Sequence, residues 1–395
     1  MISVRKTMRK ILYFLIVLCL SQTKVVAQNI NLNQGGANKS GYLIKLPYEI
    51  IKNKIIVTAE VGGKKRRFIL DTGAPVAIFR HLFNEINPSV YDTKILTDAN
   101  GRKDSAQTVI IGDISLGDVS FKNIPALVVQ EDLFTDCFHV DGILGSNLFR
   151  KSIVRISALD KTVTITDDRN KLPLRNVPSS PLTLDQQSNP YIWVTFRNNL
   201  NEMVLFDSGA DEYYTISRDH FAKMKKFKAF QTIAEGYGSN SISIAGLAEN
   251  EMLSKLFIPI LSINGTEIDN IIAETTSSPV SRVGAKILRF GVITLDFRNG
   301  RFYYQPYLPI NDAREKRWNM SMVVKDGLLW VSAIWGKTDG RVQIGDQILM
   351  IDGVDCKNLT LCDILDNPFL KDKNEAFLII KKDNGETTDW EIKKE

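Results

Sequence analysis

The stretch Phe68-Ile-Leu-Asp71-Thr-Gly-Ala74 returns 136 residues later as Val204-Leu-Phe-Asp207-Ser-Gly-Ala210. In both copies, three apolar residues lead to an aspartate, and a hydroxyl residue, a glycine and an alanine follow. An apolar strand that ends in an acid before a glycine turn holds the carboxylate near backbone N–H groups. One such copy is common in turns, but a repeated copy suggests that the whole surrounding unit is duplicated.

A second repeated block supports the duplication. LGSNLFRKSI at 144–153 corresponds to VGAKILRFGV at 283–292, at an offset of 139, and a strand-turn-strand pattern follows each block. Two landmarks in the same order at nearly constant offset predict two homologous β lobes, over 41–175 and 185–307. Prolines interrupt the junction between them at Pro173, Pro178, Pro181 and Pro190.

The local patterns predict a mainly β chain. The β-branched run at 55–61 is followed by Gly62-Gly63 and a second apolar run at 67–70, which is typical of a hairpin. Helical patterns are few, at 81–87, 146–151 and 219–230. With 44% hydrophobic and 24% charged residues, the composition is that of an ordinary globular protein.

The first 27 residues have the pattern of a signal peptide. A basic segment precedes the ten-residue apolar run ILYFLIVLCL at 11–20, which is too short to cross a bilayer, and Ala27 is a plausible cleavage position. We therefore expect a secreted or periplasmic protein without a transmembrane helix in the mature chain. Lipidation at Cys19 is the weaker alternative. Residues 28–40 are polar and read as a flexible leader.

Charge and cysteine content exclude several classes. Five of the 50 basic residues lie in the first 27, which hold no acid, so 45 basic residues face 45 acidic ones afterwards and nucleic-acid binding is not expected. Three scattered histidines and no CxxC or HExxH motif indicate neither a metal site nor a cofactor. Cys137, Cys356 and Cys362 read as three buried thiols, with a Cys356–Cys362 bond as the alternative.

A pseudo-two-fold axis between the lobes would bring Asp71 and Asp207 together. Two carboxylates in contact cannot both ionise cheaply, so the pair keeps one proton over a wide pH range. The ionised partner can then activate a water and the protonated partner can donate to a substrate carbonyl, without metal or histidine. Thr72 and Ser208 are expected to brace the two loops, and Gly73 and Gly209 to let the backbone approach the acids.

These motifs resemble those of aspartic peptidases. Both lobes lie in one chain, as in pepsin-like enzymes, but the residues of the motifs, Asp-Thr-Gly-Ala and Asp-Ser-Gly-Ala, are closer to those of retroviral-type and bacterial members. Gly142-Ile-Leu-Gly145 matches the family's apolar segment beneath each active loop, whereas Ser281-Arg-Val-Gly284 places Arg282 at an apolar position. The resemblance implies an endopeptidase that acts on peptides or proteins. Because both lobes lie in one chain, no dimer is needed to form the pair of acids, and we expect a monomer. It also implies flap hairpins, with Gly101 in the first lobe and Tyr237 in the second as candidate substrate contacts.

The segment 315–395 resembles a PDZ domain, through Val342-Gln-Ile-Gly-Asp-Gln-Ile-Leu-Met-Ile-Asp-Gly353. That resemblance implies a small α+β module that binds a peptide C-terminus by strand addition. The usual glycine-rich loop is absent near 318–322, so a packing role is an equal alternative.

Two functional hypotheses remain open on the sequence. The first is an exported aspartic endopeptidase with a docking module, and the second is an inactive duplicated fold that only binds peptides. A serine peptidase is disfavoured because no Gly-x-Ser-Gly-Gly-like nucleophile motif occurs. Ala74 and Ala210 stand where pepsin-like enzymes carry hydroxyl donors, so we expect a mildly acidic to near-neutral optimum.

Overall fold

The computed structural model describes residues 31–97, 103–130, 136–240, 242–243, 246–338, 340–366 and 369–395. The predicted signal peptide, with Cys19 and Ala27, and the hairpin residue Gly101 lie outside these residues. Residues 32–395 form one compact unit. In the described part of the chain, no helix is long and apolar enough to cross a membrane.

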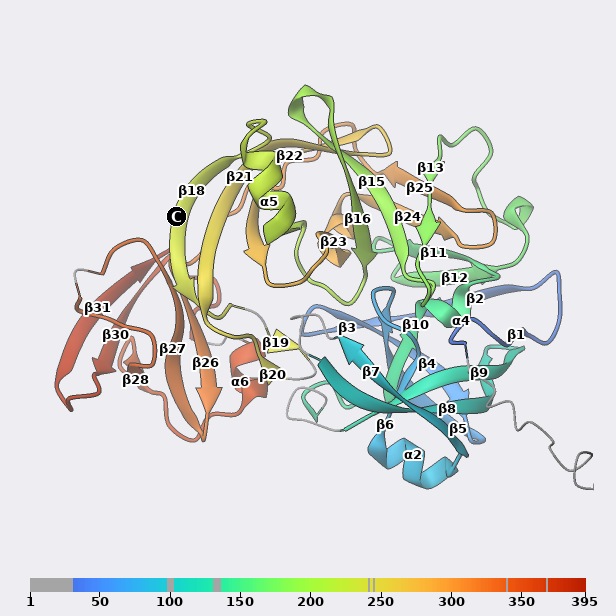
Figure 1. The fold of residues 1–395 in the computed structure, drawn as a ribbon, viewed down its shortest axis with the longest axis horizontal. Coiled ribbons are helices and arrows are strands. Elements are labelled where there is room, and N and C mark those ends of the chain that lie inside the picture. The colour runs from blue at the N-terminus through green and yellow to red at the C-terminus, as the bar shows by residue number, and fades with distance from the viewer. Residues whose placement is uncertain are drawn as a thin grey trace, which may run out of the picture. The chain divides into compact units, whose positions relative to one another are not determined.

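The first lobe is built on a nine-stranded sheet, drawn in blue to green in Figure 1. Its strands are β1 (Gly36–Ala37), β3 (Glu49–Ile51), β4 (Lys54–Val61), β5 (Lys64–Asp71), β6 (Ala77–Phe79), β7 (Val90–Thr97), β8 (Lys103–Leu116), β9 (Val119–Val129) and β10 (Gly142–Gly145). The helices α2 (Arg80–Ile86) and α4 (Ser146–Phe149) follow β6 and β10. Gly62 and Gly63 both have positive φ, which explains the β4–β5 turn.

The strand β10 fixes the end of β5. It runs parallel to β5, with Gly145 opposite Asp71, and antiparallel to β6. A Cβ on Gly145 would lie 2.2 Å from the Ala74 carbonyl oxygen, so only glycine lets the two backbones come this close. The turn that carries Asp71 is thereby held between β5 and β6.

The second lobe repeats this arrangement. Its strands are β14 (Thr183–Leu184), β15 (Pro190–Phe196), β16 (Leu200–Asp207), β17 (Thr215–Ser217), β18 (Gln231–Gly238), β19 (Ile242–Ser243), β20 (Gly246–Leu247), β21 (Glu251–Ile263), β22 (Thr266–Thr276) and β23 (Arg282–Gly284). The helix α5 (Arg218–Lys225) follows β17. As β10 does in the first lobe, β23 runs parallel to the strand that ends in the aspartate, with Gly284 opposite Asp207.

A six-stranded sheet joins the two lobes. It contains β2 (Leu43–Pro47), β11 (Ile153–Ser157), β12 (Thr162–Thr166), β13 (Ser180–Pro181), β24 (Gly291–Asp296) and β25 (Arg301–Pro306). The short 3₁₀ helix η1 (Arg169–Lys171) follows β12 and η3 (Ala285–Arg289) precedes β24, whereas η2 (Arg197–Asn199) connects β15 to β16 in the second lobe. The strand β11 pairs antiparallel with β24, from Ile153 opposite Asp296 to Ile156 opposite Ile293. The repeated strand-turn-strand units therefore pair with each other, and the prediction of a mainly β chain with two similar lobes is confirmed.

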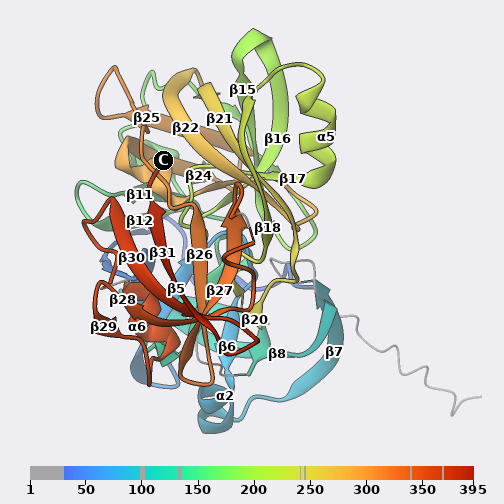
Figure 2. The same ribbon diagram turned by 90° about the vertical axis from the view of Figure 1, so that its left-hand side faces the viewer.

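The C-terminal unit extends the sheet of the second lobe. It contains β26 (Met320–Lys325), β27 (Leu328–Trp335), β28 (Gln347–Ile351), β29 (Val354–Asp355), α6 (Leu361–Asp366), β30 (Glu375–Lys381) and β31 (Thr387–Lys393). Figures 1 and 2 show β18 of the second lobe beside β27, and the register pairs Gly236 with Trp335. The buried Lys255 of β21 strengthens this junction, with its ammonium 3.8 Å from the centre of the Trp335 ring.

Part of the expected flexible leader is fixed to the first lobe. Leu32 is buried, its carbonyl accepts from the Asn147 side chain at 3.1 Å, and β1 pairs with β9. The expectation of a loose segment is therefore wrong for residues 32–38. The polar composition of this segment does not indicate the strand β1, because the backbone hydrogen bonds that hold β1 do not require particular side chains.

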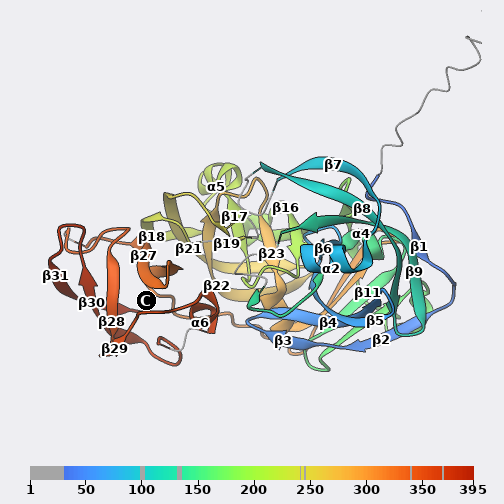
Figure 3. The same ribbon diagram turned by 90° about the horizontal axis from the view of Figure 1, so that it is seen from below.

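The cysteine expectations are also corrected. A disulfide joins Cys137 of the first lobe to Cys362 of α6, while Cys356 is a buried free thiol. Leu361, Cys362 and Leu365 of α6 pack against an apolar cluster of the first lobe that includes Ile69, Phe79 and Ile143. Figure 3 shows α6 in a view from below, together with the first-lobe strands. Nearness in sequence favoured Cys356 as a partner, whereas the fold brings Cys362 to a residue 225 positions away.

The disulfide gives a stability prediction. It closes a chain segment of 225 residues, and removing such a long crosslink increases the entropy of the unfolded chain, at a cost of roughly 2–5 kcal/mol. We expect Cys137→Ser to lower the free energy of unfolding by this amount, measured by denaturant titration. A reductant should lower the wild-type value to that of the variant and leave the variant unchanged; a variant that still responds to the reductant would contradict the assignment.

Candidate active site

The two aspartates end equivalent strands and their side chains cross toward the opposite lobe. A Cβ placed on Gly73 would lie 2.5 Å from Cγ of Asp207, and one on Gly209 would lie 2.5 Å from Cγ of Asp71. Each carboxyl group therefore fills the space above the glycine of the other loop. The structure thus brings together the two acids that the repeat singled out, and it gives both glycines the steric role expected for them.

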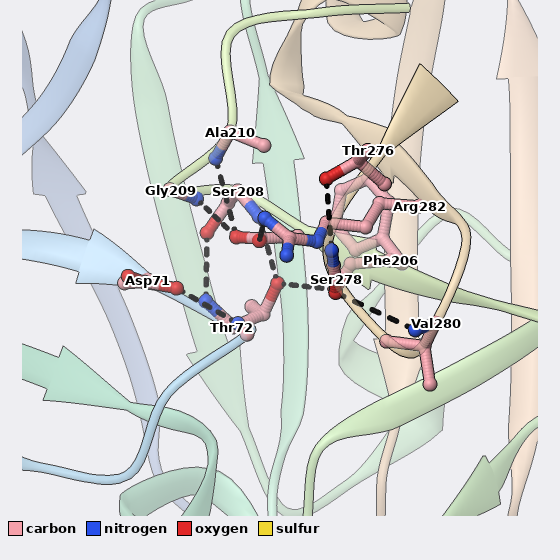
Figure 4. A network of polar contacts seen from close by, with 12 residues as sticks. Asp71, Thr72, Phe206, Ser208, Gly209, Ala210, Thr276, Ser278, Val280 and Arg282 are labelled. Atoms are coloured by element: carbon pink, nitrogen blue, oxygen red, sulfur yellow. Dashed lines mark hydrogen bonds and ion pairs between the residues drawn. The ribbon is translucent and has the colours of Figure 1, made fainter. Parts of the chain in front are cut away.

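Two hydroxyl groups hold the loops against each other. The Thr72 hydroxyl donates to the Phe206 carbonyl at 2.8 Å and accepts from the Ser208 N–H at 3.0 Å. Reciprocally, the Ser208 hydroxyl donates to the Leu70 carbonyl at 2.9 Å and accepts from the Thr72 N–H at 3.0 Å. Figure 4 shows this pairing from close by. Four buried hydrogen bonds thus fix the distance between the loops that carry the acids.

The two carboxyl groups accept different numbers of hydrogen bonds from the backbone. Asp71 accepts one hydrogen bond from the backbone, from the Gly73 N–H at 2.8 Å. Asp207 accepts two on the same oxygen, from the N–H groups of Gly209 at 2.9 Å and Ala210 at 3.2 Å. Because such donors stabilise a carboxylate, the loop geometry favours the negative charge on Asp207.

Burial and the neighbouring acid raise the pKa of Asp71 to about 8. Loss of water around the carboxylate is the largest cause, and the charge of Asp207 is the second. A hydrogen bond with the Asp207 carboxyl acts in the same direction, whereas the Gly73 N–H opposes it. The pair therefore favours retention of one proton near neutral pH, and the smaller number of backbone donors at Asp71 favours that acid as the position of the proton.

Two cations beside the acids were not predicted as site residues. The Lys54 ammonium at the start of β4 donates to the Gly209 carbonyl at 2.5 Å, across the two lobes. Arg282 of β23 lies with a guanidinium nitrogen 3.8 Å from an Asp207 oxygen. Lys54 carries no motif, so the sequence offered no signal for it. Arg282 does stand out in the sequence as a charge at an apolar position, but this signal does not indicate its closeness to Asp207.

Tyr237 does not contact the acids in any described interaction. It pairs with Ile334 and Met252 at the junction with the C-terminal unit, where its side chain is 50% exposed. It lines an open pocket there, together with Glu235, Gln343 and Ile344. A contact between Tyr237 and substrate stays a prediction.

Comparisons with known proteins agree with the geometry of the first lobe. A family model for aspartyl proteases matches residues 57–148, which run from β4 to α4 and include Asp71. The coarser inference of an aspartyl protease fold is confirmed by this match. A search of curated proteins finds no match.

Several solved structures are similar at low identity, each over 67% of this chain. Basic 7S globulin from soybean is 11% identical over 94% of its chain, with a TM-score of 0.40. Conglutin gamma from lupine seeds is 12% identical over 95%, with a TM-score of 0.38. An aspartic proteinase from Irpex lacteus is 14% identical over 97%, with a TM-score of 0.40. Values this low say nothing about the activity of this chain.

The raised pKa of Asp71 gives a stability prediction that does not depend on activity. Between about pH 4 and pH 8 the unfolded chain releases this proton and the folded chain keeps it, so rising pH favours unfolding. In the wild type, the free energy of unfolding should therefore fall by about 1.4 kcal/mol per pH unit for this one proton. The Asp71→Asn variant lacks this decrease. We therefore expect the variant to become increasingly more stable than the wild type from pH 4 to pH 8, in denaturant titrations. Asp389→Asn, at an exposed strand position, is the matched control; an equal gain there would contradict the prediction.

Proposed function

We propose that this protein is an aspartic endopeptidase that hydrolyses peptide bonds with a water held between Asp71 and Asp207. The observation that carries the proposal is the contact between these two carboxyl groups, which come from the repeated loops of the two lobes. Two carboxyl groups this close favour retention of one proton between them. Aspartates placed in this way can act as acid and base together. Thr72 and Ser208 are the bracing residues, and Gly73 and Gly209 make room for the carboxyl groups.

The charge distribution assigns a role to each acid. Asp207, as the ionised partner, takes a proton from the water while the water oxygen bonds to the carbonyl carbon. Asp71 gives its proton to the carbonyl oxygen, which yields a neutral tetrahedral diol. When the C–N bond breaks, the proton on Asp207 passes to the leaving nitrogen and a diol hydroxyl returns its proton to Asp71. Both acids are then in their initial state, and no covalent enzyme intermediate forms.

Export and the nature of the C-terminal unit belong to the same proposal. A secreted or periplasmic location is supported by the signal-like N-terminus and by the disulfide, since disulfides persist in oxidising compartments. We take the C-terminal unit as a PDZ-like module whose attachment favours a packing role. It joins β18 of the second lobe through β27 and the first lobe through Cys362, so it braces both lobes of a monomeric enzyme.

A cleavage assay tests the catalytic roles. The wild-type chain should cleave members of a peptide library, and a hydroxyl-bearing transition-state mimic should inhibit it because the hydroxyl takes the position of the water. Asp71→Asn and Asp207→Asn should each lower kcat by at least about 100-fold, which is the order of magnitude of one general acid or base. The exposed Asp389→Asn serves as the control and should retain full activity.

Folding has to be verified for each variant by its denaturation transition. If the folded wild type and both active-site variants are equally inert on the library, while peptides bind to all three, the chain is the inactive peptide-binding fold instead.

The pH dependence follows from the position of the proton. Activity requires protonated Asp71, so it should be lost as the pH rises through about 8, and the optimum should be mildly acidic to near neutral. Ala74→Ser and Ala210→Ser each add a hydroxyl donor beside the pair, which favours the charged form and should move the profile to lower pH by about one unit. The measurement is kcat/KM against pH; an optimum near pH 2 for the wild type would be incompatible with this site.

A further inference from the structure

The face of the second-lobe sheet that bears Asp207 also bears a cation. Side chains alternate along a strand, so Leu205 and Asp207 of β16 point to one face, while Phe206 is fully buried on the other. Arg282 lies opposite Leu205 in the parallel partner β23, and Val283 is fully buried beside Phe206. Arg282 therefore emerges on the face of Asp207, and its guanidinium reaches to 3.8 Å from the Asp207 carboxyl. Figure 4 shows this side chain directed toward Ser208 and Gly209.

The first lobe has no such charge at the matching position. Ile143 of β10 lies opposite Ile69, as Arg282 lies opposite Leu205, and it packs in an apolar cluster with Ala74 and α6. The duplicated lobes thus differ at this residue by a full positive charge. A fixed charge this close to one of two coupled acids breaks the symmetry of the pair.

We propose that Arg282 is a positioning residue that keeps the single negative charge of the acid pair on Asp207 and leaves the shared proton on Asp71. Its guanidinium adds a positive charge on the side where the N–H groups of Gly209 and Ala210 already bind the carboxylate. This inference rests on the proposed function for its catalytic consequence, because the division into acid and base follows from it.

The second cation near the acids, Lys54, does not cancel the effect of Arg282 on the pair. The positive charge of Lys54 lowers the pKa of Asp71, and its ammonium donates to the Gly209 carbonyl. Burial and the charge of Asp207 act more strongly on the pKa of Asp71 than Lys54 does, and this pKa stays raised to about 8. Lys54 therefore moderates the retention of the proton on Asp71 without reversing it.

The remaining ionisable groups around Arg282 are few in the described residues. Burial raises the pKa of Tyr191 on β15, the charge of Asp185 acts in the same direction, and the charge of Arg282 opposes both. The strand β17 contributes only Thr215 opposite Arg282. The groups to be considered in a titration are therefore Asp71, Asp207, Lys54, Tyr191 and Asp185.

Three variants test the proposal. Arg282→Ile gives the second lobe the residue that the first lobe has at this position, and Arg282→Gln removes the charge but keeps a polar side chain. Arg282→Lys retains a cation. In the folded full-length chain, we expect the acidic midpoint of the kcat/KM profile to rise by about one to two pH units in the two neutral variants. In the lysine variant it should rise by less than half of that.

The protonation of the pair can also be followed without activity. Carboxyl ¹³C shifts in aspartate-labelled protein report the two titration steps, and Asp71→Asn and Asp207→Asn assign them. The lower titration step of the pair should move upward in Arg282→Ile or Arg282→Gln, so one folded neutral variant is sufficient. A structural role alone would change the melting temperature and kcat without moving either midpoint.

The outcomes separate the two proposals. If the wild type cleaves peptides but neither neutral variant moves the acidic midpoint or the lower ¹³C step, the role of Arg282 is refuted and the peptidase stands. If the wild type is inert but the ¹³C step moves as expected, the electrostatic role of Arg282 is supported and the proposed activity is refuted.

Discussion

The structure depends on holding two acids in contact across a lobe boundary. Two carboxylates in contact repel each other and lose their hydration water. Both effects favour a protonated Asp71, whose pKa is raised to about 8. The buried hydroxyl groups of Thr72 and Ser208 hold the two loops together against this repulsion, because each hydroxyl both donates and accepts a hydrogen bond across the lobe boundary. The six-stranded sheet joins the two lobes a second time, because β11 of the first lobe pairs with β24 of the second.

Much of this was predictable because duplication leaves two readable copies. The repeated Asp-hydroxyl-Gly-Ala motif and the repeated block at 144–153 and 283–292 were sufficient to predict two β lobes and the pair of acids. The predicted strands rest on local patterns of side chains, which folding preserves. In each lobe the repeated glycine segment pairs with the strand that ends in the aspartate, with Gly145 opposite Asp71 and Gly284 opposite Asp207.

What could not be predicted consists of contacts between distant segments without a motif. Cys137 and Cys362 meet only because α6 packs on the first lobe, and the sequence gives no hint of that packing. The position of Lys54 beside Gly209 depends in the same way on how the lobes meet. The anchored leader shows a further limit, since β1 is held by backbone groups that every residue has. Arg282 is intermediate: its charge was visible, but its distance to Asp207 was not.

The two lobes share a fold and differ in electrostatics, and this difference has chemical value. In a perfectly symmetric pair the proton has no preferred position, so under the proposed mechanism either acid could be in the wrong protonation state when a peptide is bound. Here the asymmetry arises from backbone and side chain together: two N–H donors and Arg282 at Asp207, against one N–H donor at Asp71. The C-terminal unit, bonded to the first lobe and continuous with the second, limits relative movement of the loops. A fixed geometry preserves the charge difference, because the effect of Arg282 on Asp207 decreases as their separation increases.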